Sequence, residues 1–118
     1  MKKSLKVLSA SALLVASLAA PAQASYYVYG NKGDYMGKLN LFMDGETRYG
    51  LAGTYVVDDE YIVNTISAEV VDNGRSKAYK KNTMASSATT KTVVCNYSGV
   101  VGVHKIISPN NGNWDATT

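Results

Sequence analysis

Apolar and polar residues alternate with a period of two along several segments of the chain, a pattern typical of half-buried β-strands. The clearest segment covers residues 61–71, where the intervening Thr65, Ser67 and Glu69 are polar. The face between them holds Ile62, Asn64, Ile66, Ala68 and Val70, of which only Asn64 is polar. We therefore predict a strand with one buried face at this position.

A hairpin is predicted around Asp44-Gly45, because this residue pair accepts the positive φ angles of a tight two-residue turn. The strands before and after this turn each carry one mainly apolar face. These faces consist of Tyr35, Leu39, Leu41 and Met43 in the first strand and of Tyr49, Leu51, Tyr55 and Val57 in the second.

A second hairpin is predicted at Asn73-Gly74, and the return strand over residues 75–81 has the lysines of a protected sheet edge. Further strands are predicted at residues 25–29, 92–97 and 100–107, with a loop or weak strand at 82–90 and a loop at 108–114. The predicted fold is all-β: a small single-domain sandwich or barrel of six to eight short antiparallel strands.

Residue usage supports this class. Residues 25–118 contain 11 valines, nine threonines and nine tyrosines, but only three leucines. Branched and aromatic side chains suit a pleated surface, whereas a helical domain of this size would contain more leucine and alanine.

The N-terminus has the three parts of a secretory signal peptide. Lys2, Lys3 and Lys6 precede an uncharged run over residues 7–20, and small residues at Ala22 and Ala24 end it. The run is too short to span a bilayer, which needs about 20 residues. We predict a signal peptide over residues 1–24, cleavage after Ala24, and one β-rich mature domain over residues 25–118.

Removal of the signal peptide changes the charge. The whole chain carries +3, but residues 25–118 hold nine basic and nine acidic side chains. Because the mature domain is neutral, the basic charge of the whole chain does not indicate a surface that binds nucleic acid or membranes. Position 25 is serine rather than a cysteine for lipid attachment, and no second long apolar stretch follows. The chain is expected to be a small secreted bacterial protein without a membrane span in its mature form.

Catalytic residues are not evident in the sequence. The single histidine, His104, has no recognisable partner set, and we interpret it as an ordinary strand residue. The single cysteine, Cys95, is expected to be buried; the alternatives are a bridge to a second chain, which would give a dimer, and a nucleophile. The chain is therefore expected not to be an enzyme.

Two acidic groups invite a calcium interpretation: the cluster Asp58-Asp59-Glu60 and the pair Asp44 and Glu46. Neither has the spacing that wraps one ion, and turn chemistry explains an aspartate at these points. We expect no metal and no cofactor.

Aromatic side chains are the best candidates for binding. Tyr26, Tyr27 and Tyr29 cluster at the start of the mature domain, and tyrosine suits recognition surfaces. Trp114 lies among asparagines, where it could stack on a sugar or pin the C-terminal loop to the core. The basic segment 75–81 is interpreted as a solvated sheet edge rather than a polyanion site.

The function expected from these features is non-enzymatic recognition of a protein, a glycan or an envelope polymer through a tyrosine-bearing sheet face. The alternative is a secreted bacteriocin-like or toxin-like protein that acts on other cells. Two further alternatives are an enzyme built on His104 or Cys95 and self-assembly through edge strands.

Overall fold

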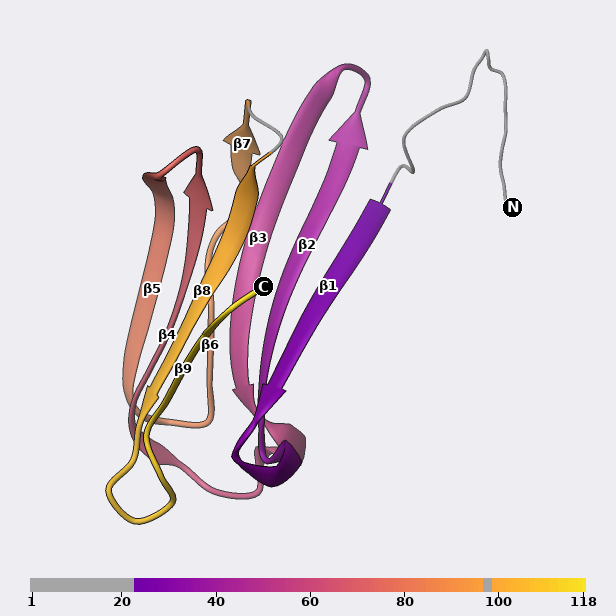
Figure 1. Cartoon of the computed structure of the whole chain (residues 1–118). Helices are drawn as coiled ribbons and strands as arrows, with labels where there is room; N and C mark the ends of the chain where they lie inside the picture. Colours follow the sequence, from indigo (N-terminus) through magenta and orange to yellow (C-terminus); the bar gives the residue numbers. More distant parts are fainter. Residues whose placement is uncertain (1–22, 97–98) are drawn as a thin grey trace, which may run out of the picture.

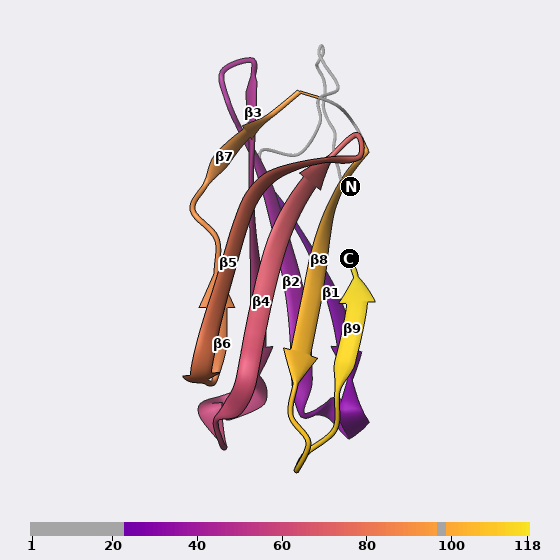
Figure 2. The same cartoon turned by 90° about the vertical axis from the view of Figure 1, so that its left-hand side faces the viewer.

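The computed structural model describes residues 23–96 and 99–118 of the chain. Within these residues, nine strands form two antiparallel sheets that face each other across one core (Figure 1, Figure 2). Apart from Gln23 and Ala24, the predicted signal peptide lies outside the described residues. No helix in the described part of the chain has the length and apolar character needed to cross a membrane.

Sheet A has the strand order β1-β2-β3-β6, and β7 also pairs with β3. Its strands are β1 (Gln23–Gly30), β2 (Tyr35–Asp44), β3 (Thr47–Val56), β6 (Ser87–Thr89) and β7 (Val93–Cys95). Sheet B has the order β5-β4-β8-β9. Its strands are β4 (Val63–Asp72), β5 (Arg75–Ala85), β8 (Val100–Ile107) and β9 (Trp114–Thr117), and the short 3₁₀ turns are η1 (Asn31–Gly33) and η2 (Val57–Asp59).

The prediction of a small, β-rich antiparallel domain is confirmed, and the number of strands is nine rather than six to eight. The segment 82–90 completes β5 and forms β6, which pairs with β3. The loop prediction for the C-terminal segment was wrong at Trp114, where β9 begins and pairs with β8. The intervening turn is closed by hydrogen bonds from the Asn111 and Gly112 amides to the Ser108 carbonyl.

Both predicted hairpins are present. Asn73 and Gly74 take φ angles of 53° and 79°, the two positive values that a tight turn with this hand of twist requires. At the β2–β3 hairpin only Gly45 has a positive φ, 63°, and Asp44 is still paired with Thr47. The turn residues there are therefore Gly45 and Glu46, one position later than the sequence prediction placed them.

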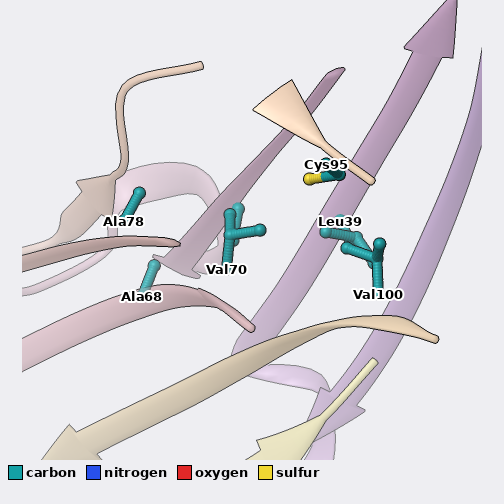
Figure 3. Close-up of a cluster of buried hydrophobic side chains, with 7 residues drawn as sticks. Leu39, Ala68, Val70, Ala78, Cys95 and Val100 are labelled. Carbon is teal, nitrogen blue, oxygen red and sulfur yellow. The ribbon is translucent and has the colours of Figure 1, made fainter. Parts of the chain in front are cut away.

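The core consists of two buried clusters between the sheets. Figure 3 shows the first, in which Leu39 from sheet A faces Val70 and Val100 from sheet B, with Cys95 beside them. The second contains Tyr35, Val56, Val63, Ile66, Ala88 and Ile106. Apolar burial of this kind is the main favourable contribution to folding of a small domain.

The sequence prediction grouped the faces of β2 and β4 largely correctly. Ile66, Ala68 and Val70 are buried in β4 as expected. Ile62 and Asn64, by contrast, are exposed. Ile62 precedes the strand, and Val63 is buried in place of Asn64, so the regular alternation begins only at Thr65 and Ile66.

In β3 the larger side chains face solvent. Its buried positions on the core side are the small residues Gly50, Ala52 and Thr54, followed by Val56. Tyr49, Leu51 and Tyr55 lie on the opposite, outer face. Space on this side of β3 is limited by the neighbouring strand β7: a Cβ at Gly50 would lie 3.1 Å from the Cys95 sulfur.

Candidate binding surface

The outer face of sheet A carries two exposed and three half-buried aromatic rings. In antiparallel sheets, residues directly opposite one another point to the same face. The registers of β1, β2 and β3 therefore place five rings on one surface, which we call the aromatic face: Tyr27, Tyr29, Phe42, Tyr49 and Tyr55.

The most accessible part of the aromatic face is on β1. Tyr27 is 50% exposed and Tyr29 is 60% exposed, although both belong to a regular strand. Their ring centroids are 6.5 Å apart with an interplanar angle of 13°. The ammonium of Lys38, which is opposite Tyr27 on β2, lies 5.7 Å from the centre of the Tyr27 ring. This is within the range of a cation–π interaction and holds the ring in place.

A second stacked pair lies across β2 and β3. Phe42 and Tyr49 are directly opposite one another, with centroids 5.3 Å apart and an interplanar angle of 20°. Cross-strand aromatic pairs of this kind stabilise a sheet by up to about 1 kcal/mol. The pair is half-buried, and it leaves ring surface open to solvent.

Tyr55 extends the same face toward β6. Its ring covers Gly53, where the phenol would collide with any added Cβ atom, and this explains the glycine at that position. Its hydroxyl is 3.4 Å from the Thr89 hydroxyl of β6. The aromatic face therefore reaches across the sheet from β1 at one edge to β6 at the other.

Polar side chains lie between the two stacked pairs. The Ser25 hydroxyl donates to Asn40 Oδ1 at 2.6 Å, which leaves the Asn40 amide nitrogen as a donor toward solvent. Lys38 adds a cation on the same face. The surface thus offers flat apolar rings, one ammonium group and amide and hydroxyl groups side by side.

The structure separates the four binding residues predicted from the sequence. Tyr27 and Tyr29 lie together on the aromatic face. Tyr26 is 50% exposed but points to the opposite face of β1, as its pairing with the buried Leu39 shows. Trp114 is on β9 of sheet B, where its side chain lies beside Gly30 at the end of β1.

Trp114 packs between the two sheets. Its indole occupies the space where a Cβ at Gly30 would be, and its ring centroid is 5.8 Å from that of the buried Tyr35. The neighbouring amides close the β8–β9 turn: Asn113 Oδ1 accepts from the Ser108 amide at 2.8 Å and Asn111 Oδ1 from the Ser108 hydroxyl at 3.1 Å. These contacts agree with the alternative in which Trp114 pins the C-terminal segment to the core.

His104 is completely buried between the sheets, as part of a hydrogen-bonded network. Thr54 donates its hydroxyl proton to the Ser67 carbonyl at 2.7 Å, so its oxygen accepts from His104 Nδ1 at 2.9 Å. Nε2 lies 3.1 Å from the hydroxyl oxygen of Thr118, which also accepts from the Gly102 amide. Burial lowers the pKa of His104 to about 4, against a weaker opposing effect of a backbone hydrogen bond with Gly53.

This network joins sheet A to sheet B. Thr54 belongs to β3, whereas His104 belongs to β8. The imidazole also fills the space beside Gly37, where an added Cβ atom would overlap it. His104 is therefore placed as a neutral structural group, and the hydroxyl and carbonyl groups around it are occupied in holding the sheets together.

Cys95 is 2% exposed, as the sequence predicted, and its sulfur faces the first core cluster (Figure 3). Burial raises the pKa of its thiol, and the nearby Asp72 carboxylate raises it further, against smaller lowering effects of Lys77 and Arg48. A hollow of about 290 Å³ beside it is also lined by Arg48 and Glu46. A bridge to a second chain would require Cys95 to leave this position.

The acidic cluster is part of the turn η2. Asp58 and Asp59 have φ angles of 60° and 52°, and Asp59 Oδ1 accepts from the Ser86 hydroxyl at 2.8 Å. Within the described ranges 23–96 and 99–118, no three histidine, cysteine or acidic side chains come together as metal ligands would.

Phe42, Tyr49, Tyr55 and Lys38 were not predicted as part of a binding surface. A signal was present, because a two-residue turn at the β2–β3 hairpin requires the odd positions of β3 to share a face with the even positions of β2. Comparison of the chain with family models, with curated proteins and with solved structures found no match.

Proposed function

We propose that this chain is an exported, non-enzymatic binding protein that recognises a polymer of the cell envelope, with its ligand on the aromatic face of sheet A. The observation that carries the proposal is the exposure of Tyr27 and Tyr29, 50% and 60%, in a regular strand that needs no aromatic side chain on its solvent side. Exposed aromatic groups that gather on one surface favour interaction sites.

A glycan fits this surface better than a compact small molecule. A sugar ring has an apolar C–H face and polar edges, so it can stack on a tyrosine ring while its hydroxyls bond to neighbouring groups. Asn40 and Lys38 supply such groups between the Tyr27–Tyr29 pair and the Phe42–Tyr49 pair. Two aromatic pairs on one sheet face can engage successive units of an extended chain.

Export is a second part of the proposal. Cleavage after Ala24 would remove the first two residues of β1, Gln23 and Ala24, which pair with Phe42 and Leu41. The remaining strand residues, Ser25–Gly30, still include Tyr27 and Tyr29 of the aromatic face. The mass and N-terminal sequence of the protein recovered from the culture medium test this directly, with Ser25 expected as the first residue.

A depletion assay tests the binding function. The purified protein is incubated with insoluble wall polysaccharides and whole-envelope preparations, and the fraction left in solution is measured. Saturable removal by at least one glycan, competed by soluble fragments of it, is expected. A protein that stays in solution with every preparation contradicts the proposal.

A further inference from the structure

β1 forms a free edge of sheet A. All eight of its residues pair with β2, from Gln23 opposite Phe42 to Gly30 opposite Tyr35. Among the described residues no strand pairs with the other side of β1, which forms the outer margin of the sheet in Figure 1. Such an edge presents a row of backbone N–H and C=O groups that can pair with another strand.

The other long edge strand, β5, is protected in three ways. It carries four basic side chains: Arg75, Lys77, Lys80 and Lys81. Its register with β4 shifts at Val70/Val71, and Met84 has a φ of 49°. Charges and backbone irregularities are the usual means of preventing edge-to-edge association.

None of these protections is found in β1. Its sequence from Gln23 to Gly30 has no charged residue and no proline, and its register with β2 has no shift. Both tyrosines on its outer face are at least half exposed. A long, regular, uncharged edge strand is therefore available for strand addition.

We propose that a second copy of this chain pairs with β1, so that two β1 strands run antiparallel about a two-fold axis and join two copies of sheet A into one continuous sheet. Three observations favour a second copy over other arrangements. The two strands have the same length and the same regular geometry; they bring no like charges together; and the remaining edge strands are unsuitable. β9 has four residues, β6 and β7 have three each, and β5 is basic and irregular.

The residues of β1 favour one register. With the axis at Val28, Tyr27 lies opposite Tyr29 of the second copy, and Tyr29 lies opposite the second copy's Tyr27. On the other face, Tyr26 lies opposite the second copy's Gly30, which is covered by the Trp114 indole of that copy. This register uses residues 26–30 only, so it is available after cleavage at the predicted site. Each cross-strand aromatic pair adds up to about 1 kcal/mol to such an association.

The pairing goes beyond the proposed function and does not depend on it. Val28 points to the inner side of sheet A, away from the aromatic face, so a change at Val28 can abolish the dimer without removing a ring. A dimer that binds no glycan would support the pairing but contradict the proposed function. A monomer that binds a glycan would do the reverse.

Sedimentation velocity over a concentration series tests the pairing, with Val28→Lys as the variant and Val28→Thr as its matched control. The half-buried position tolerates a lysine whose ammonium reaches solvent in the monomer, but two lysines would meet at the two-fold axis. A reversible dimer is expected for the native chain, with a dissociation constant raised at least about tenfold by Val28→Lys and little changed by Val28→Thr. Thr83→Lys on β5 is the control for added charge and should leave the dimer intact.

Circular dichroism establishes whether the lysine variant is folded. If it is not, hydrogen exchange of the native chain decides, because the edge-facing amides of β1 should become more protected as concentration rises. A native chain that stays monomeric at millimolar concentration overturns the proposal. So does a dimer that Thr83→Lys weakens and Val28→Lys does not, or β1 protection that is independent of concentration.

Discussion

The solvent-facing sides of sheet A and sheet B differ in the side chains that they carry. Both sheets cover the same core and turn their other side to solvent (Figure 2). Sheet B does so with hydroxyl, charged and aliphatic groups, and Tyr79 is the one aromatic ring on its outer face within the described residues. The outward residues along its two central strands are Thr65, Ser67, Glu69, Val71, Val101, Val103, Lys105 and Ile107.

This difference separates what the fold requires from what it permits. Sheet B shows that a solvent face of this sandwich is stable with ordinary polar and branched residues. The outer face of sheet A therefore has more aromatic residues than a stable solvent face requires. Stacking between Phe42 and Tyr49 accounts for only two of the five. Tyr27 and Tyr29, which remain at least half exposed, are the part best explained by recognition.

The largest expected effect concerns the sandwich that both faces share. His104 is buried and neutral, and its pKa in the folded chain is about 4 rather than the ordinary 6.5. Below pH 6.5 the unfolded chain binds a proton that the folded chain excludes, so stability present at neutral pH is lost as the pH falls. The free energy of unfolding should fall by about 3 kcal/mol between pH 6.5 and pH 4.

Urea unfolding at half-unit pH steps measures this loss. Because His104 is the only histidine in the chain, its ring protons can be followed by NMR without ambiguity. Stability that is flat between pH 6.5 and 4.5 would contradict the role given to His104.

The next effect separates the two faces in binding. The double variant Tyr27→Ser/Tyr29→Ser removes the exposed pair from sheet A, whereas Tyr79→Ser removes a ring of 59% exposure from sheet B. Loss of the pair should weaken binding to the envelope polymer by about thirtyfold, equivalent to about 2 kcal/mol. Tyr79→Ser should leave the affinity unchanged. Affinity is measured by isothermal titration. If the double variant and Tyr79→Ser lose the same affinity, the aromatic face is no more important for binding than the outer face of sheet B.

A smaller effect tests how far the Phe42–Tyr49 pair serves the fold. In a double-mutant cycle of Phe42→Leu and Tyr49→Leu, the coupling energy for unfolding should be about 0.5–1 kcal/mol, because the two rings stack across β2 and β3. A cycle of Glu69→Ala and Tyr79→Leu on sheet B, where the residues are also directly opposite, is the comparison and should give a smaller coupling. If the coupling energy between Phe42 and Tyr49 is zero, a contribution to fold stability does not explain why these two rings lie opposite each other.

The smallest effect concerns Lys38. Its ammonium lies over the Tyr27 ring, and exposed cation–π contacts contribute about 0.5 kcal/mol. Lys38→Met should therefore lower stability only slightly and change affinity for a neutral glycan by less than about threefold. Lys105→Met on sheet B should not alter binding. A large, salt-sensitive loss with Lys38→Met would instead indicate an anionic ligand.

Much of the fold could be predicted from local patterns. Period-two alternation located β2, β4 and β8, and Asp-Gly and Asn-Gly pairs located the two tight hairpins. The protected edge at β5 followed from its lysines. These features are local because strand pleating and turn geometry depend on neighbouring residues.

The remaining features depend on contacts between distant residues. Trp114 looked like a loop residue among asparagines, and its place in β9 depends on Gly30, 84 positions earlier. The polar partners of His104 come from β3 and from Thr118. In β3, size would place Tyr49 inside and Ala52 outside. This order is reversed because Thr54 of the same strand bonds directly to Ser67 and His104 of sheet B, which leaves little space for large side chains.

The candidate surface was partly predictable. Tyr27 and Tyr29 were found by composition, because tyrosine clusters are visible in a single segment. Phe42 and Tyr55 come from two further strands and join that surface only through the register of β1, β2 and β3. Tyr26 shares the composition signal but faces the other side, since neighbouring residues of a strand point in opposite directions.

The most direct test of the aromatic face as the binding surface is an NMR titration of the labelled protein with the glycan that depletes it from solution. We expect the largest chemical-shift changes at Tyr27, Tyr29, Asn40 and Phe42, with the β4 and β8 residues of sheet B unchanged. Shifts concentrated on the outer face of sheet B, with those four residues unaffected, would contradict this account.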